Sequence, residues 1–186
     1  MGEYAEELAD AKRLPRQIPL TLGKVAIVDA DDFDELSKYK WFAQRKPQKG
    51  FPDYFYACRQ ERSEGGKGRR QRVVMMHNQI MPPPPGMVVD HRNRNGLDNR
   101  KENLRHATNS QNMQNKRYRD KGLPRGVSKI KISGRFRARI RDNGVLISLG
   151  CFDTAEEAAR AYDKASLMLH GEFGIRNFAA NDNSDT

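Results

Sequence analysis

The sequence of 186 residues predicts an α+β fold built from two small modules. In residues 86–117, two short apolar runs flank a loop rich in Asn, Gly and Asp, a pattern that predicts strand, loop, strand and helix. Residues 124–152 predict three short strands with Gly at both turns, and a helical pattern that starts at Thr154 follows them. The second module is therefore expected to be a three-stranded antiparallel sheet packed on one helix. Hydrophobic residues make up 37% of the chain, which allows two small cores.

The part of the chain before the first module predicts further strands. Three strands and one helix are expected there: a strand at Lys24–Val28, an acidic helix at about 31–38, a strand through Trp41 and Phe42, and a strand at 52–60. Residues 61–72 combine Gly with charge and predict a flexible hairpin tip. The apolar run 73–81 predicts a strand that leads into a short helix, and Pro82–Pro85 predict an extended spacer.

Within the first module, the run "GMVVDH" predicts a strand that ends with Asp90 and His91. The run "NLRHAT" predicts the second strand, and Thr108 or Asn109 can cap a helix through about 110–119. Seven Asn residues lie in or next to the loop and the helix. Asn fills a core poorly, so most of these amides are expected to tie the loop through hydrogen bonds to its backbone.

The second module shows hairpin and helix signals. Turns are expected at Ser133-Gly134 and Asn143-Gly144, and Asn-Gly is a strong hairpin signal. Alternation in the middle strand predicts one apolar face, Phe136, Ala138 and Ile140, and one basic face, Arg135, Arg137, Arg139 and Arg141. Four Arg with no acidic partner between them would repel, and a bound polyanion would remove that cost.

The helix of the second module is expected to start with a capping box, Thr154 with Glu157, and to end at Gly171. Its inner stripe is expected to consist of small and apolar residues: Ala158, Ala161, Tyr162, Ala165 and Leu169. The alanines would let the helix lie close to the sheet.

Charge predicts the class of partner. The net charge is +10 and the isoelectric point about 9.8, which favours nucleic acid as the partner, with an anionic membrane second. Residues 41–120 hold seventeen Lys and Arg against seven Asp and Glu, and residues 121–150 hold eight against one. No apolar run approaches a membrane span, and the first residues lack the apolar core of a secretion signal. Cys58 and Cys151 lie far apart, which predicts buried thiols in a reducing, cytosolic setting and no structural zinc site.

The first module carries residues suited to phosphodiester hydrolysis. Such a reaction needs a base for water and a divalent cation for the phosphoryl and leaving oxygens. The imidazole of His91 suits the base, while the carboxylate of Asp90 and the amide oxygen of Asn112 suit a hard ion such as Mg²⁺. An Asp-His pair alone is weak evidence, because surface pairs of this kind are common.

The whole pattern "VDH…NGLDNRKENLRHAT…QN" resembles the HNH nuclease family over about residues 73–118, in the form found in homing endonucleases. The resemblance implies a ββα-metal module that grips one metal ion, Mg²⁺ or Mn²⁺. It implies a catalytic set of His91, the general base, and Asn103, which ties the loop down, with Asp90 and Asn112 as metal ligands. It also implies a position near the DNA backbone for His77, although a satisfied polar group at a strand–helix junction is an equal explanation. His106 is expected to be structural.

The segment "LGCFDTAEEAARAYDKASLMLHGEFGIRNF" resembles the APETALA-two, or ethylene-response-factor, DNA-binding domain. There the sheet lies in the major groove, which implies a set of DNA contacts in this chain: Arg125, Lys129, Lys131, Arg135, Arg137 and Arg139. Phe136 stands where many relatives carry Trp, and Ser148 replaces another aromatic residue, so the target sequence cannot be borrowed from plant proteins.

Together these observations predict a metal-dependent homing-type DNA endonuclease. Residues 17–120 would form the nuclease module with its N-terminal β extension, residues 121–180 the DNA-binding domain, and residues 1–16 and 181–186 disordered ends. The protein is expected to be a cytoplasmic monomer, associated with a phage or bacterial nucleoid, that binds double-stranded DNA and no membrane. The alternatives are a DNA-binding regulator with a structural HNH module, and an RNA-binding protein, which the sheet disfavours because it lacks exposed aromatic platforms.

Overall fold

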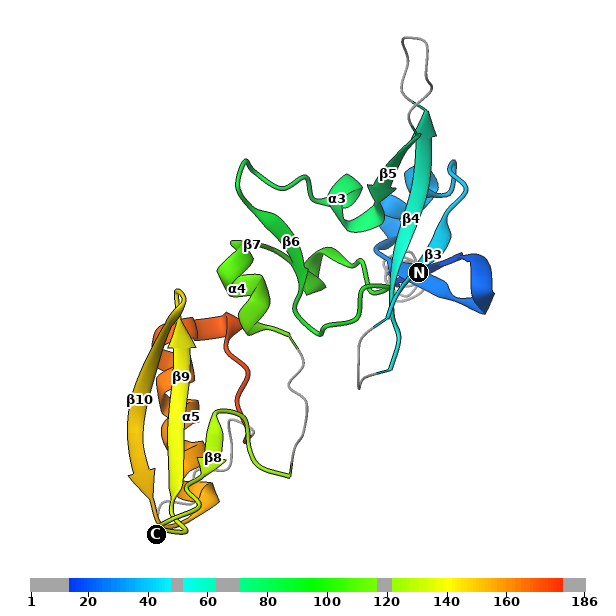
Figure 1. Cartoon of the computed structure of the whole chain (residues 1–186). Helices are drawn as coiled ribbons and strands as arrows, with labels where there is room; N and C mark the ends of the chain where they lie inside the picture. Colours follow the sequence, from blue (N-terminus) through cyan, green and yellow to red (C-terminus); the bar gives the residue numbers. More distant parts are fainter. Residues whose placement is uncertain (1–13, 48–51, 63–70, 117–121, 179–186) are drawn as a thin grey trace, which may run out of the picture. The chain divides into compact units, whose positions relative to one another are not determined.

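The structure is a computed structural model that describes residues 14–47, 52–62, 71–116 and 122–178. It is a mixed α+β fold with several small antiparallel sheets (Figure 1). Contacts divide the chain into two compact units, 1–107 and 108–186, each of which is described by itself. The sequence had suggested a division after residue 120. Of the ends expected to be disordered, only residues 14–16 fall within the described part, and Arg16 begins a strand.

Unit 1 contains seven strands and two α-helices among its described residues. Its elements are β1 (Arg16–Pro19), η1 (Thr21–Gly23), β2 (Val25–Val28), α2 (Ala30–Leu36), β3 (Phe42–Lys46), β4 (Tyr54–Arg62), β5 (Gln71–Met75), α3 (Met76–Ile80), β6 (Val88–His91), η2 (Lys101–Asn103) and β7 (Leu104–Ala107). The expected strands and helices of this part are confirmed with shifted ends. Strand β1 was not expected, and most of the predicted hairpin tip, 63–70, lies outside the described residues.

Three antiparallel sheets make up unit 1: β1-β2, β3-β4-β5 and β6-β7. A core formed by the first two sheets and the helices includes Val28, Trp41 and Met76, which are almost fully buried. The Trp41 indole donates a hydrogen bond to the Leu36 carbonyl oxygen at 2.8 Å, so the polar edge of this buried ring is satisfied. Cys58 is buried as expected, and burial raises the pKa of its thiol to about 11.

The loop between β6 and β7 is attached to the first sheet. The Ile27 amide donates to the Leu97 carbonyl oxygen at 2.8 Å, and the Asn99 amide donates to the Ile27 carbonyl oxygen at 2.7 Å. Gly96 lies against β4 so closely that an added Cβ would fall 2.5 Å from the Phe55 carbonyl oxygen. Since real Cβ atoms do not approach so closely, only glycine lets the loop meet β4 at this point.

Unit 2 begins with a short helix and continues with a sheet and a long helix. Its elements are α4 (Asn109–Gln114), β8 (Val127–Lys129), β9 (Phe136–Asp142), β10 (Val145–Phe152), α5 (Ala155–His170) and η3 (Gly171–Phe173). Thr108 and Gln111 form a capping box at α4, and Thr154 and Glu157 form the expected one at α5. Helix α4 ends earlier than the predicted residue 119, and residues 117–121 lie outside the described part.

The antiparallel sheet β10-β9-β8 packs one face on α5, as predicted (Figure 1). Asn143 and Gly144 both have positive φ, of 44° and 85°, as a tight two-residue hairpin turn requires. At the start of β8, Gly126 leaves room for the Tyr162 ring, because an added Cβ would lie 2.0 Å from it.

Two expectations about this unit are wrong. Leu169 is 44% exposed, because the buried row of α5 follows the i, i+4 spacing through Ala158, Tyr162, Ser166 and His170 and so leaves Leu169 outside. Because Ser166 and His170 are polar, a pattern of apolar residues at helical spacing does not identify this buried row. Cys151 is exposed, because it faces away from α5 on β10, opposite Arg137.

Candidate functional site

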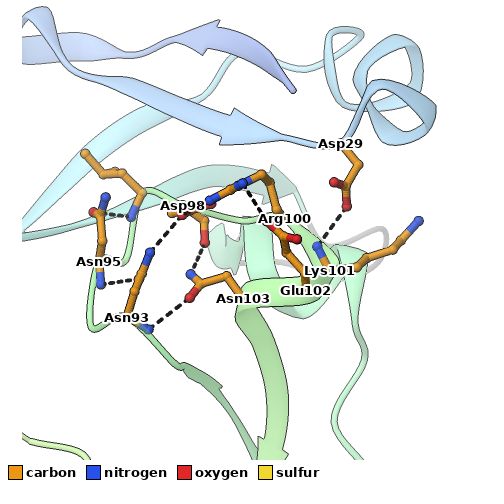
Figure 2. Close-up of polar contacts among 9 residues, drawn as sticks. Asp29, Asn93, Asn95, Asp98, Arg100, Lys101, Glu102 and Asn103 are labelled. Atoms are coloured by element: carbon orange, nitrogen blue, oxygen red, sulfur yellow. Dashed lines mark hydrogen bonds and ion pairs between the residues drawn. The ribbon is translucent and has the colours of Figure 1, made fainter. Parts of the chain in front are cut away.

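The loop between β6 and β7 is organised around the Asp98 carboxylate (Figure 2). Arg100 donates to both of its oxygens at 2.8 Å in a two-pronged ion pair, and the Asn93 side-chain amide donates to Oδ2 at 2.8 Å. Asp98 is buried, and the Arg100 guanidinium lowers its pKa. The carboxylate therefore stays charged and holds both sides of the loop together.

Amides close the rest of the loop. Asn103 accepts a hydrogen bond from the Asn93 backbone amide at 2.9 Å and donates to the Asp98 carbonyl oxygen at 2.7 Å. Asn95 accepts from the Leu97 backbone amide at 3.2 Å (Figure 2). The prediction that the amides tie the loop is confirmed. The Asn103 side chain thus bonds to backbone groups on both sides of the loop.

The C-terminal side of the loop is held by the segment around α2. The Lys101 backbone amide donates to Asp29 Oδ2, and its ammonium group donates to Asp32 Oδ1, both at 2.8 Å. These bonds join residues about seventy positions apart in the chain. The loop is thus fastened to β2 at its centre and to the start of α2 at its end.

His91 ends β6, and its side chain is only 3% exposed. Its Nε2 lies 3.3 Å from the side-chain oxygen of Asn99, a residue that is completely buried. Burial lowers the pKa of His91, while the hydrogen bond to Asn99 and the nearby charges of Asp90 and Asp98 oppose that shift. The net lowering keeps the imidazole neutral near pH 7, which is the form a general base requires.

Two further rings surround His91. The His77 ring meets it edge to face with centroids 5.0 Å apart, and the Tyr56 ring lies 5.9 Å from it. His77 lies in α3 and is 7% exposed, and its Nδ1 has no hydrogen-bond partner in the described part of the chain. Burial, followed by the neighbouring His91, lowers the pKa of His77 to about 3. The structure therefore places His77 beside the candidate base.

Asp90 faces the opposite strand. Its carboxylate Oδ2 accepts two hydrogen bonds from the Arg105 guanidinium, from Nε at 2.9 Å and from the terminal nitrogen at 2.8 Å. Both side chains are buried, and the two residues are direct partners in the β6-β7 register. The ion pair orients the carboxylate and compensates its charge inside the protein.

Asn112 lies in α4, half-buried, and belongs to unit 2. Among the residues that the structure describes, no group of three or more His, Cys, Asp and Glu could hold a metal ion. The carboxylate of Asp90 and the amide oxygen of Asn112 are each hard oxygen donors, the type of ligand that Mg²⁺ and Mn²⁺ prefer.

The outer face of the second sheet carries Arg137, Arg139 and Arg141, while Ala138 and Ile140 are buried under α5. The alternation predicted for the middle strand is thus confirmed over β9. The prediction that this row has no acidic partner is wrong at its first member. Arg135 precedes β9, and its Nε pairs with Asp153 at 2.8 Å. The pairing arises because β10 runs antiparallel to β9, so the end of β10 returns beside Arg135.

The other expected DNA contacts differ in their surroundings. The Arg125 guanidinium donates to the carbonyl oxygens of Gln114 and Lys116 at 3.0 and 3.1 Å, so it ties the end of α4 to the second module. The Lys129 ammonium lies 5.7 Å from the centre of the Phe136 ring. Lys131 is exposed in the turn after β8.

Two residues of the site were missed in the sequence. The loop pattern gives Asn99 no role of its own, and the pattern of the second strand gives Arg105 none. Pairing "VVDH" antiparallel with "LRHA" places Arg105 opposite Asp90, so strand register could have revealed the ion pair. No local pattern in the sequence distinguishes Asn99 from its neighbours.

Comparisons with known proteins agree with both parts of this arrangement. The family model of the HNH endonuclease matches residues 80–114, and that of the AP2 domain matches residues 122–172. The fold and the site therefore define a protein of the HNH class that also carries an AP2 domain. An uncharacterised HNH endonuclease of Acanthamoeba polyphaga mimivirus is 30% identical over 158 residues, which span 83% of this chain and 75% of the viral protein. The chain belongs to the HNH endonuclease family.

The plant relatives match only the C-terminal part. An APETALA2-like protein of Oryza sativa is 43% identical over 61 residues, which are 33% of this chain and 14% of the rice protein. An ethylene-responsive transcription factor of Arabidopsis thaliana is 51% identical over 49 residues, 25% of this chain and 19% of the plant protein. No helix in the described part of the chain is long and apolar enough to cross a membrane.

Burial of His77 predicts acid sensitivity. Its pKa is about 3 in the folded chain, against 6.5 for an ordinary exposed imidazole, so the unfolded chain binds the proton more readily. The stability that neutral His77 contributes is complete above pH 6.5 and is lost progressively as the pH falls toward 3. The urea midpoint of unit 1, followed by fluorescence of the single Trp41, should therefore fall between about pH 6.5 and 4.5.

The variant His77→Phe keeps a ring beside His91 and removes this titration, so the midpoint should fall less steeply over the same range. His106→Gln serves as the control, because His106 is exposed and bonds to the Pro82 carbonyl oxygen. It should leave the steepness as it is in the wild type. An equal steepness in His77→Phe and the wild type would show that His77 is not the source.

Proposed function

We propose that the protein is a metal-dependent DNA endonuclease of the homing type, in which an HNH module cuts and an AP2 domain positions it on double-stranded DNA. The observation that carries this proposal is the fastened loop, which buries His91 as a neutral base directly after Asp90. Membership of the HNH endonuclease family and the AP2 match support it. We also propose that residues 17–120 and 121–180 are the two functional domains.

In the proposed reaction, His91 takes a proton from water, and the water oxygen attacks phosphorus. The bond from phosphorus to the 3′-oxygen breaks, the leaving oxygen takes a proton from solvent, and His91 returns its proton to solvent, which gives 3′-hydroxyl and 5′-phosphate ends. Asp90, oriented by Arg105, and Asn112 would hold the metal in a ββα-metal module. A bound divalent cation would stabilise charge on the phosphoryl and leaving oxygens. For Asn112 the assignment depends on its position in the family motif.

For His77 we propose a supporting role beside His91, in place of the DNA contact expected from the sequence. Its burial leaves little of the side chain for a DNA backbone, while its ring covers one side of the base. Asn103 would act on the reaction through the loop that it closes.

The outer face of β9 is the proposed DNA-binding surface. Arg137 and Arg139 stand on it opposite the helix-packed face, in a segment with eight basic residues and one acidic residue. Phosphates and guanine edges in the major groove would accept hydrogen bonds from such side chains. Arg135 and Arg125 make other contacts in the structure, so Arg137 and Arg139 are the strongest members of the expected set.

A DNA-binding regulator with a structural HNH module is the second candidate. The plant relatives include proteins named as transcription factors, and the basic face of β9 suits either function. The intact set of Asp90, His91 and Asn112 favours cleavage, because a purely structural loop has no need of a buried base.

The base can be tested by His91→Ala. Cleavage of duplex DNA should slow by about 100-fold or more, the low end of what a positioned general base supplies, while DNA affinity should stay close to the wild-type value. Single-turnover cleavage and filter binding measure the two quantities separately. An unchanged cleavage rate would remove His91 from the mechanism.

Metal dependence can be tested by chelation. Excess chelator should abolish cleavage, and Mg²⁺ or Mn²⁺ should restore it. Asp90→Asn and Asn112→Ala should each lose about 100-fold or more in rate, because a metal contributes several kcal/mol at the transition state. Asp90→Asn is preferred to alanine because it keeps an acceptor for Arg105. Full activity in chelator would contradict the proposed site.

The DNA-binding surface can be tested with the double change Arg137→Ala and Arg139→Ala. If each side chain contacts one phosphate, the log–log slope of affinity against salt should become less steep by about 0.9 per contact, roughly 1.8 in total. Arg160→Ala removes one positive charge from α5, on the opposite side of the sheet, and should leave the slope unchanged. Equal slopes in the double variant and the wild type would place the binding surface elsewhere.

A further inference from the structure

We propose that Asn99 is a positioning residue that fixes the tautomer of His91: it accepts the Nε2 proton and thereby makes Nδ1 the nitrogen that takes the proton from water. This inference deepens the proposed nuclease function and rests on it. Neither the family match nor the loop pattern assigns a role to Asn99.

The geometry gives the contact between the two residues. The side-chain oxygen of Asn99 lies 3.3 Å from His91 Nε2. Asn99 is 0% exposed and His91 3% exposed, so bulk water cannot easily replace this hydrogen bond. A buried polar group that loses its partner is costly, which makes the bond a strong constraint on the ring.

The contact with the Asn99 oxygen favours one of the two neutral tautomers of the His91 ring. Neutral imidazole carries a proton on one ring nitrogen and a free lone pair on the other. The hydrogen-bond partners of the two nitrogens determine which of them is protonated. The carbonyl oxygen of an amide can only accept. The bond to Nε2 therefore exists only when Nε2 carries the proton, and the lone pair that can take a proton is then on Nδ1.

Asn99 can impose this choice because its own position is fixed. Its backbone amide donates to the Ile27 carbonyl oxygen at 2.7 Å. The preceding residue, Asp98, is held through its side chain by Arg100 and through its carbonyl oxygen by Asn103. The amide oxygen of Asn99 thus belongs to a part of the loop that is held by backbone and side-chain hydrogen bonds.

A second observation supports a functional reason for an amide here. The Nδ2 group of Asn99 is buried and has no hydrogen-bond partner within the described residues. An unsatisfied buried donor lowers stability, and an apolar side chain of the same size would avoid that cost. An amide at this position is therefore explained by its oxygen, which meets His91. Among the described residues, the Asn103 side chain by contrast bonds to backbone groups of the loop.

The test combines a spectrum of the full-length protein with cleavage kinetics. Long-range proton–nitrogen correlation of ¹⁵N-labelled protein at a pH of about 8 shows which ring nitrogen of each neutral histidine carries the proton. The chain has four histidines, and the His91 signals are assigned by their loss in His91→Gln. We expect the His91 proton on Nε2. A proton on Nδ1 in the wild type, as when the Asn99 amide is turned over and donates, overturns the inference.

Three variants then separate positioning from structure. Asn99→Leu keeps a similar volume and removes the acceptor, so it should mix the tautomers and lower kcat roughly 10-fold or more, with KM unchanged, on supercoiled plasmid DNA with Mg²⁺. Asn99→Asp keeps an acceptor oxygen and should retain the Nε2 proton. His106→Gln changes an exposed side chain that bonds to the Pro82 carbonyl oxygen, and it should retain both the His91 tautomer and kcat.

Wild-type tautomer and wild-type kcat in Asn99→Leu would overturn the inference. If Asn99→Leu does not fold, the wild-type spectrum still decides, because it needs no variant of Asn99. If the wild type cuts no DNA with Mg²⁺, the proposed nuclease function fails, whereas the spectrum still shows whether Asn99 sets the tautomer.

Discussion

The candidate site depends on the charged carboxylate of Asp98. The loop around it has few apolar side chains and cannot be shaped by a core of its own, so polar bonds must define it. The two-pronged ion pair with Arg100 and the bond from Asn93 fix both flanks of the loop at one point. Since the pair is largely withdrawn from solvent on the Asp98 side, it is screened less than a surface ion pair would be. The positions of Asn99, Asn103 and therefore His91 follow from this arrangement.

The N-terminal strands supply what the loop lacks. Strand β2 offers both a donor and an acceptor at Ile27, and the loop uses them as an additional strand would. Apolar Leu97 packs against the core that contains Trp41 and Met76, which places a hydrophobic contact in the middle of the polar loop. The segment before the family motif is thus part of the site's construction.

Local signals in the sequence predicted much of this structure. The turn at Asn143 and the helix caps at Thr108 and Thr154 depend only on residues within a few positions, and the structure contains all of them. Strand β1 was missed because its pairing with β2 is defined by a partner beyond the short apolar run. The ion pairs Asp90–Arg105 and Arg135–Asp153 join residues on different segments, so only register reveals them.

Burial was the least predictable property. Leu169 and Cys151 were expected inside and lie outside, whereas Ser166 and His170 line the packed face of α5. Helix α5 lies very close to the backbone at Gly126 and Gly174. At these contacts the size of a residue matters more than its hydrophobicity. The contact of Asn99 was equally hard to predict. Several other Asn residues lie near it in the sequence, and only its contact with His91 in the folded chain distinguishes it from them.

The bonds from Lys101 to Asp29 and Asp32 also affect the order in which the chain folds. They close a loop of about seventy residues, an entropic cost that favours formation of the shorter-range contacts first. During synthesis the acidic partners leave the ribosome well before the segment that carries His91, so the anchor is present when the catalytic loop emerges. A chain that stops short of residue 101 has the anchor without the loop. The loop that follows His91 can therefore reach its anchored form only in chains that have passed this point.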